Sequence, residues 1–130
     1  MKEPLTFPNI EAQVCVYLTP LLGIPAVRVL PATLPADFVR VMLTGSTRRN
    51  LSLSDARVTL ECWAPVGKDA DAESLGRRTY AYMCAFATET AWVPLGADGW
   101  TQGPYADIDP DTKRPRYVMT ANVRQAAYRL

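Results

Sequence analysis

The clearest strand pattern in the chain is the alternation of apolar and polar residues between Asp55 and Ala64. One side of such a strand carries Ala56, Val58, Leu60 and Cys62, and the other side carries Arg57, Thr59, Glu61 and Trp63. This alternation predicts a strand with one face buried. Pro65 and Gly67 follow directly and are expected to end it.

A long helix is predicted after this strand, beginning near Asp69. The carboxylates of Asp69 and Asp71 suit a helix N-terminus, where unpaired N–H groups and the helix dipole favour negative charge. The residues that recur at helical spacing are Ala72, Leu75, Thr79, Tyr82, Met83 and Phe86. A stripe of this kind indicates a helix packed across the sheet, so a sheet covered by a helix is the expected core.

A shorter helix is predicted near the N-terminus, with Asn9 as its N-cap. Its apolar stripe consists of Ile10, Val14, Tyr17 and Leu18. Because a proline disfavours helical geometry at the preceding residue, Pro20 predicts that this helix ends at about Thr19.

Strands are predicted at 26–30, 38–44, 100–105 and 116–124, with the strand at 100–105 interrupted at Gly103 and Pro104. Residues 45–54 are predicted to form a projecting polar hairpin loop, 89–99 a turn-rich connection anchored by Trp92, and 107–115 a loop. The last strand turns Tyr117, Met119, Ala121 and Val123 to one face, and residues 125–130 extend it or fray. The order α-β-β-β-α-β-β predicts a single α+β domain over 1–130, with two main helices on a largely antiparallel or mixed sheet of about five strands.

Composition excludes several classes of protein. The chain is 48% hydrophobic and 21% charged, as in ordinary globular proteins, and no apolar run approaches the ~20 residues that span a bilayer. The N-terminal stretch has an acid and two prolines where a signal peptide needs an apolar segment, so we expect the protein to act on the cytosolic side. A net charge of +1 argues against a protein that coats nucleic acid with its whole surface. The basic pairs and triplets of the chain are typical of solvated faces.

Candidate catalytic chemistry is sparse. The sequence contains no histidine, which removes imidazole bases and histidine metal sites, and its three cysteines are interpreted as reduced, structural thiols. The stretch Asp107–Asp111 opens like a calcium loop, but Thr112 and Val118 stand where Gly and Glu are required. Trp63, Trp92 and Trp100 are interpreted as core or interface anchors rather than as a platform for bases.

Two stretches of the sequence carry a family resemblance. The run from Leu34 to Ala64 contains Leu-Pro-Ala-Asp-Phe-Val-Arg-Val-Met-Leu-Thr-Gly, then Ser-Asp-Ala-Arg-Val and Glu-Cys-Trp-Ala. An alanine-bearing helix, Gly103-Pro104, Asp109-Pro110 and Pro115-Arg116-Tyr117 follow in order. Together these resemble the tail terminator proteins of long-tailed bacteriophages, especially those of actinobacterial hosts. Ser46 departs from the second glycine expected after Gly45, which affects the expected shape of that loop tip.

The resemblance implies an α/β fold that assembles into a hexameric ring. Such a ring caps the tail tube, ends its polymerisation and presents the surface that joins the filled head. It implies a virion location in the tail or neck after assembly in the host cytoplasm, with the tail tube protein and a head–tail connector or stopper as partners. DNA would only pass through the lumen. No enzyme activity, cofactor, metal or membrane is implied.

On this resemblance, Arg48 and Arg49 are the candidate lumen or tube-facing residues, and Lys113, Arg114 and Arg116 are candidates for an inter-subunit or neck contact. Another neck protein, such as a head completion or stopper subunit, is the nearest alternative. A small nucleic-acid-binding regulator is a further one. An enzyme is the least favoured class, since it would depend on a divalent metal held by Asp69, Asp71 or the 107–111 loop.

Overall fold

The computed structural model describes the backbone of residues 4–89, 93–94 and 100–130, and the side chains of residues 4–86 and 103–130. Its helices are α1 (Ile10–Leu22) and α2 (Asp69–Glu89). Its longer strands are β3 (Phe38–Arg48), β4 (Leu53–Trp63), β6 (Trp100–Ile108) and β7 (Pro115–Ala126). Four two-residue strands complete the described elements: β1 (Leu5–Thr6), β2 (Ala26–Val27), β5 (Val93–Pro94) and β8 (Tyr128–Arg129).

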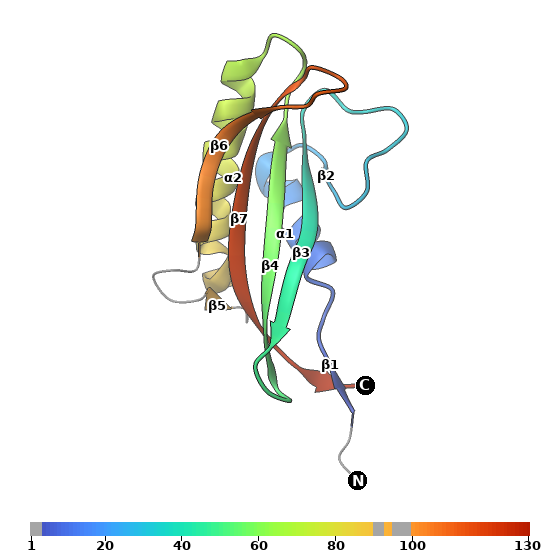
Figure 1. Ribbon diagram of the computed structural model, residues 1–130, viewed down its shortest axis with the longest axis vertical. Coiled ribbons are helices and arrows are strands. Elements are labelled where there is room, and N and C mark those ends of the chain that lie inside the picture. The colour runs from blue at the N-terminus through green and yellow to red at the C-terminus, as the bar shows by residue number, and fades with distance from the viewer. Residues whose placement is uncertain (1–3, 90–92, 95–99) are drawn as a thin grey trace.

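The main sheet has the order β2-β3-β4-β7, and β5 and β6 both pair with the far edge of β7 (Figure 1). All of its pairings are antiparallel except that of β2 with β3. β4 is the central strand, because it pairs with β3 on one side and with β7 on the other over its whole length. The predicted α+β class, with its largely antiparallel mixed sheet and two main helices in the stated order, is confirmed.

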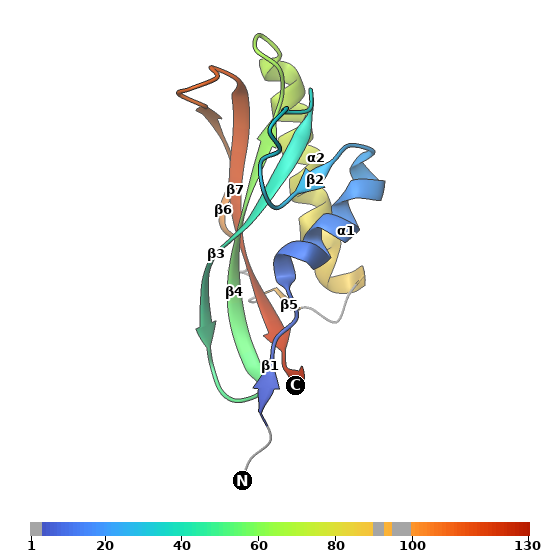
Figure 2. The same cartoon turned by 90° about the vertical axis from the view of Figure 1, so that its right-hand side faces the viewer.

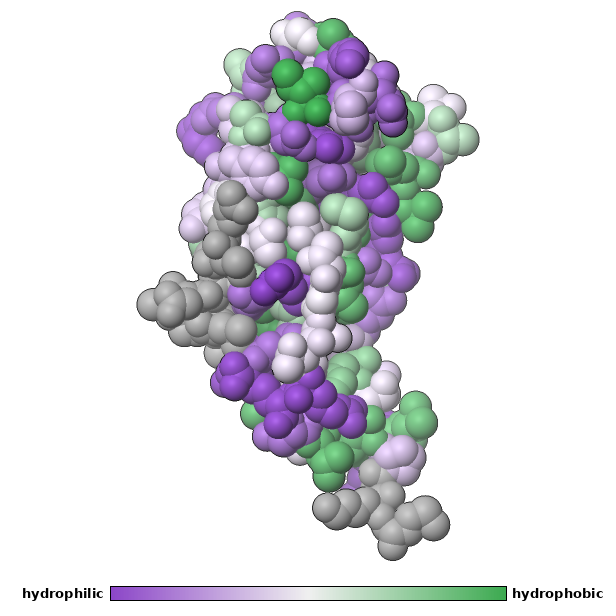
Figure 3. All heavy atoms as spheres, in the orientation of Figure 1, coloured by the Kyte–Doolittle hydropathy of each residue, from purple (hydrophilic) through white to green (hydrophobic). Residues whose placement is uncertain are grey.

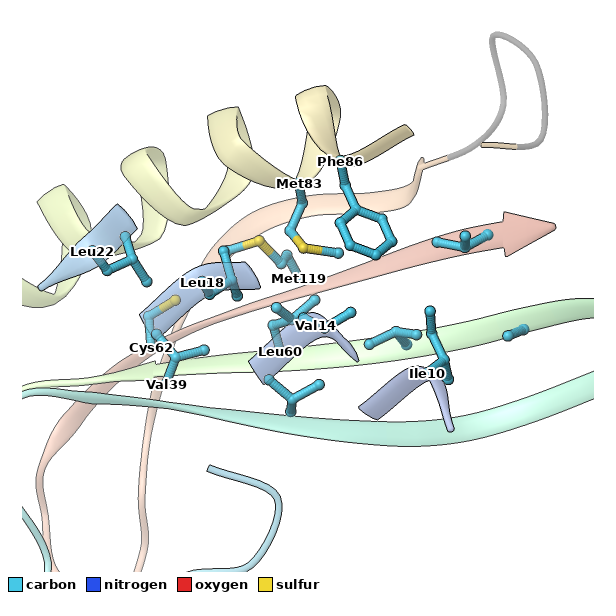
Figure 4. Close-up of a cluster of buried hydrophobic side chains, with 14 of the residues drawn as sticks. Ile10, Val14, Leu18, Leu22, Val39, Leu60, Cys62, Met83, Phe86 and Met119 are labelled. Atoms are coloured by element: carbon cyan, nitrogen blue, oxygen red, sulfur yellow. The ribbon is translucent and has the colours of Figure 1, made fainter. Parts of the chain in front are cut away.

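Both helices cover the same face of the sheet, and the opposite face carries no helix (Figure 2). Between the two layers lies a single apolar core (Figure 4). Its buried members are Ile10, Val14, Leu18, Leu22, Val39, Val41, Ala56, Val58, Leu60, Cys62, Leu75, Met83, Phe86, Met119 and Val123. The apolar residues of the alternation predicted for β4 face this core, as expected. So do the residues of the stripe predicted for α2.

The predicted end of the first helix is wrong, because α1 continues through Pro20 to Leu22. A proline inside a helix removes one N–H, and here the carbonyl that loses its partner belongs to Val16. Val16 lies on the solvent side of the helix with 76% of its side chain exposed, so water can satisfy that carbonyl. The helix ends instead at Gly23, whose left-handed backbone (φ 70°) lets its N–H bond to the Thr19 carbonyl at 3.0 Å.

The hairpin loop predicted at 45–54 is also largely strand. β3 continues to Arg48 and β4 begins at Leu53, so only residues 49–52 form the turn. The pairing runs through a register shift between Leu43 and Gly45 and resumes down to Arg48 opposite Ser54. The hairpin does project, since its lower part extends past both helices (Figure 2). The small β1–β8 sheet lies beside it on the helix side.

Other boundaries differ in length. The strand expected at 26–30 is reduced to Ala26–Val27, and the strand expected at 100–105 continues to Ile108 with register shifts before Tyr105. Pro104 is tolerated there because β6 lies at an edge of the sheet and its pairing is irregular at that point. Most of the connection expected at 89–99, including Trp92, lies outside the described residues.

Gly76 sets how closely α2 approaches the sheet. It is buried in the middle of the helix, and a Cβ atom added there would lie 2.9 Å from the Cβ of Tyr117 on β7. Such a distance is shorter than a normal contact, and neither backbone-linked atom can move away without shifting an element. The close packing of helix on sheet therefore requires glycine at this position.

We expect Gly76→Ala to destabilise the protein by about 1–3 kcal/mol, although alanine is the better helix former, because the added methyl group overpacks the contact with Tyr117. The midpoint of urea unfolding measures the change. Gly103→Ala is the matched control, since an added Cβ at Gly103 meets no atom within 4 Å. A more stable Gly76→Ala variant would contradict the proposed packing.

Candidate functional site

The helix-free face of the sheet carries a row of polar and charged side chains from its central strands. Because side chains alternate across a strand, β4 presents Asp55, Arg57, Thr59, Glu61 and Trp63 on this face. Their partners on β7 are Arg124, Asn122, Thr120, Val118 and Arg116. Hydrophilic residues cover much of the lower part of the face, near the β3–β4 hairpin (Figure 3).

At its upper end, this face is closed by aromatic and guanidinium groups. The rings of Phe38 and Trp63 stack with their centroids 5.2 Å apart, and both residues are almost fully buried although no helix covers them. The guanidinium of Arg114 lies over both rings, 5.4 Å from Phe38 and 5.8 Å from Trp63. Arg116 lies over Trp63 at 5.2 Å, so the two arginines replace the missing helix as a cover.

Arg114 also holds the backbone of two other segments. Its Nε donates to the Ala64 carbonyl at 3.0 Å, and its guanidinium donates to the carbonyls of Pro35, at 2.9 Å, and Ala36. These bonds tie the turn before β7 to the segment before β3 and to the end of β4. The Arg114 guanidinium is therefore engaged in hydrogen bonds within the chain.

Arg116 is the centre of an ion-pair network around Glu61, which is only 9% exposed. Arg116 lies 3.5 Å from Glu61, 2.7 Å from Asp107 and 3.4 Å from Asp109. The indole N–H of Trp63 donates to Glu61 at 3.3 Å. Since a buried carboxylate is costly unless it is paired, the network stabilises this end of the sheet rather than offering a free charge.

The turn between β6 and β7 is closed by Asp109. Its carboxylate accepts hydrogen bonds from the backbone N–H of Thr112 at 2.9 Å and from the Thr112 hydroxyl at 2.7 Å. These bonds, the hydroxyl bond first, hold the pKa of Asp109 below its ordinary value. Lys113 follows in an exposed position with a left-handed backbone (φ 62°). The calcium-like stretch is thus the end of β6 followed by a hydrogen-bonded turn.

Of the candidate neck-contact residues, Arg114 and Arg116 bind groups within the chain, whereas Lys113 is exposed at the surface. No sequence signal pointed to this division. The partners of Arg114 lie 50 to 79 positions away along the chain, so only the fold brings them together.

The candidate pair Arg48 and Arg49 is split by the pleat of the hairpin. Arg48 reaches toward the helix side, where it donates to the Leu5 carbonyl at 3.2 Å and lies 4.9 Å from the Phe7 ring centroid. Arg49 instead pairs with Asp55 on the helix-free face. Arg48 is the last residue of β3 and Arg49 is the first of the turn, and because their side chains reach opposite faces of the hairpin, the two arginines do not form one patch.

Below the aromatic cover, hydroxyl groups cross the helix-free face. The Thr44 and Thr59 hydroxyls lie 2.9 Å apart, and those of Thr59 and Thr120 lie 3.4 Å apart. Further down, the Asp55 carboxylate is shared by Arg49 and by Arg124, whose Nε lies 3.1 Å away. This lower region was not identified from the sequence, although Arg57 and Thr59 were placed correctly on the polar side of β4.

The three cysteines are free thiols that differ in burial. Cys62 is buried in the core, and burial raises its pKa to about 12. Cys15 is half-buried and Cys84 is exposed, and all three are free thiols. Within the described residues, no cluster of three or more acidic, cysteine or histidine side chains could hold a metal ion.

Comparison with models of known protein families gives no match, and neither does comparison with curated proteins. Within the described part of the chain, no helix is long and apolar enough to cross a membrane.

Replacing Arg116 with Met should destabilise the protein by about 3 kcal/mol, because the more distant Arg40 is then the one cation among the described residues that pairs with the buried Glu61 carboxylate. Urea unfolding measures the loss. Arg77→Met serves as the matched control, since Arg77 is an exposed helix residue paired only with Glu73. A loss no larger than that of the control would mean that Arg116 does not stabilise the sheet.

Proposed function

We propose that the protein is a tail terminator subunit of a long-tailed bacteriophage, which forms a ring without a catalytic role at the end of the tail tube. The observation that carries the proposal is the resemblance over Leu34–Ala64, which spans β3 and β4. The ring, expected to be a hexamer, ends tube polymerisation and offers its other face to a connector or stopper in the neck. Its location is the virion, after assembly in the host cytoplasm.

The geometry of the chain supports this proposal in two ways. The β3–β4 hairpin projects past the helices, which suits an element that reaches a neighbouring ring (Figure 1). The sheet also ends in two unlike edges: within the described residues, β3 pairs with no outer strand beyond Arg40, and β6 pairs only with β7. A ring needs two different surfaces on each subunit, because its interfaces are head-to-tail.

The purified protein should form rings, either alone or only at the ends of tail tubes. Native mass spectrometry and negative-stain imaging, with and without the tail tube protein, test this expectation. Rings at the head-proximal end of the tube would support a terminator, whereas rings that bind only the portal side would identify another neck protein. A monomer indifferent to tubes would contradict both.

Neutralising the hairpin arginines should impair tube capping without unfolding the protein. We choose the double variant Arg48→Gln, Arg49→Gln rather than charge reversal, because a carboxylate at position 49 would oppose Asp55. The length distribution of assembled tubes measures capping. A double variant with the same charge change at the distant, exposed residues Arg28 and Arg77 is the control. Normal tube lengths with the hairpin variant would remove these arginines from the tube contact.

A further inference from the structure

A groove of about 650 Å³ opens on the lower half of the helix-free face. It is lined by Gly45, Ser46, Thr47, Arg49, Asp55, Arg57 and Asn122. Three of these residues form one row across the sheet, because Gly45 lies opposite Arg57 and Arg57 opposite Asn122. The lack of a side chain at Gly45 leaves the stem of Arg57 uncovered on that side: a Cβ added at Gly45 would lie 3.8 Å from the Arg57 Cβ.

Arg57 is exposed, and its guanidinium makes no hydrogen bond or ion pair within the described residues. This sets it apart from its neighbours. Arg49 and Arg124 both hold Asp55, whose side chain is only 12% exposed. The groove and its rim therefore carry three guanidinium groups against one carboxylate, which leaves a local excess of positive charge although the whole chain has a net charge of only +1.

The chemistry of the lining favours an anion with several oxygen acceptors. Guanidinium groups match phosphate oxygens in a two-pronged geometry, and the hydroxyl of Thr47, which lies opposite Asp55 on this face, adds a short-range donor. The groove opens to solvent on the face of the sheet, so a bound group can belong to a longer chain. Among the residues that the structure describes, no aliphatic or aromatic side chain lines it.

That last feature distinguishes nucleic acid from an acidic protein partner. Protein interfaces gain most of their affinity from buried aromatic and apolar anchors, which this groove does not provide. Interfaces with nucleic acid are more polar and more positively charged, and much of their binding comes from arginine contacts with phosphates.

We propose that this groove binds phosphodiester groups of a nucleic acid backbone, with Arg57 as the direct phosphate ligand and Arg49 and Arg124 as flanking cations. The contact carries no sequence information, since it involves phosphates and not base edges. It is a property of the single chain and does not depend on ring assembly, so it can fail or hold independently of the proposed tail function.

The test is a titration of the isotope-labelled protein with a short DNA duplex, followed by amide chemical shifts at low salt. We expect the amides of Gly45, Arg57 and Asn122 to shift, while those of α2 do not. Raising the salt to about 0.15 M should weaken the binding strongly, because phosphate contacts release counterions. The absence of any shift at low salt would overturn the proposal.

Two variants connect the binding to this groove. Arg57→Gln should weaken DNA binding about tenfold and lower the salt dependence by about one phosphate contact. The matched control Arg77→Gln removes the same charge from the exposed side of α2 and should leave the affinity nearly unchanged. Gly45→Leu keeps the charge but fills the groove beside Arg57, so it should also weaken binding. Equal effects of Arg57→Gln and Arg77→Gln would overturn the assignment.

Two further probes distinguish the source of the anion. Poly-glutamate of equal charge should shift the groove amides much less than the duplex does. If it shifts them equally, the site belongs to an acidic protein segment and the proposal is wrong. Inorganic phosphate should bind far more weakly than the duplex at the same phosphate concentration. If the duplex has no advantage, the groove takes only a small anion, which also overturns the proposal.

Discussion

The packing of both helices against one face of β3, β4 and β7 is the interaction on which the rest of the structure depends. It removes the apolar side of every central strand from water and, through Gly76, fixes the distance between the two layers. Because side chains alternate along each strand, the same packing sends the polar side of β4 and β7 to the opposite face. The helix-free face is thus a direct consequence of the core.

The arginines of the helix-free face have different roles at its two ends. At the upper end, Trp63 and Phe38 need a cover, and Arg114 and Arg116 provide it with their planar guanidinium groups while Glu61 balances the charge. At the lower end, none of the described residues is an aromatic side chain that needs cover, and the arginines there remain close to water. The same residue type is structural in one place and available for contact in the other.

The sequence predicted the elements that depend on local pattern. The alternation in β4 and the stripe of α2 determine which residues are buried, and both were identified correctly. Boundaries set by tertiary context were not. Pro20 stays inside α1 because Val16 faces water, and β3 continues to Arg48 because β4 supplies partners on both sides of the register shift at Thr44. The candidate site was the least predictable part, since its contacts join residues far apart in the chain.

Charge pairing and strand register explain why a sequence scan for basic clusters groups residues that the fold separates. Arg48 and Arg49 are adjacent in the chain but lie on opposite faces of the hairpin. Arg49, Arg57 and Arg124 are separated in the chain but lie around one groove, because β4 and β7 are in register. Asp55 neutralises part of this group and anchors two of its arginines, which leaves Arg57 as the side chain able to meet an external anion. Strand register brings the residues of such a basic site together. Its net local charge can be worked out only once the arginines that pair with each carboxylate are known.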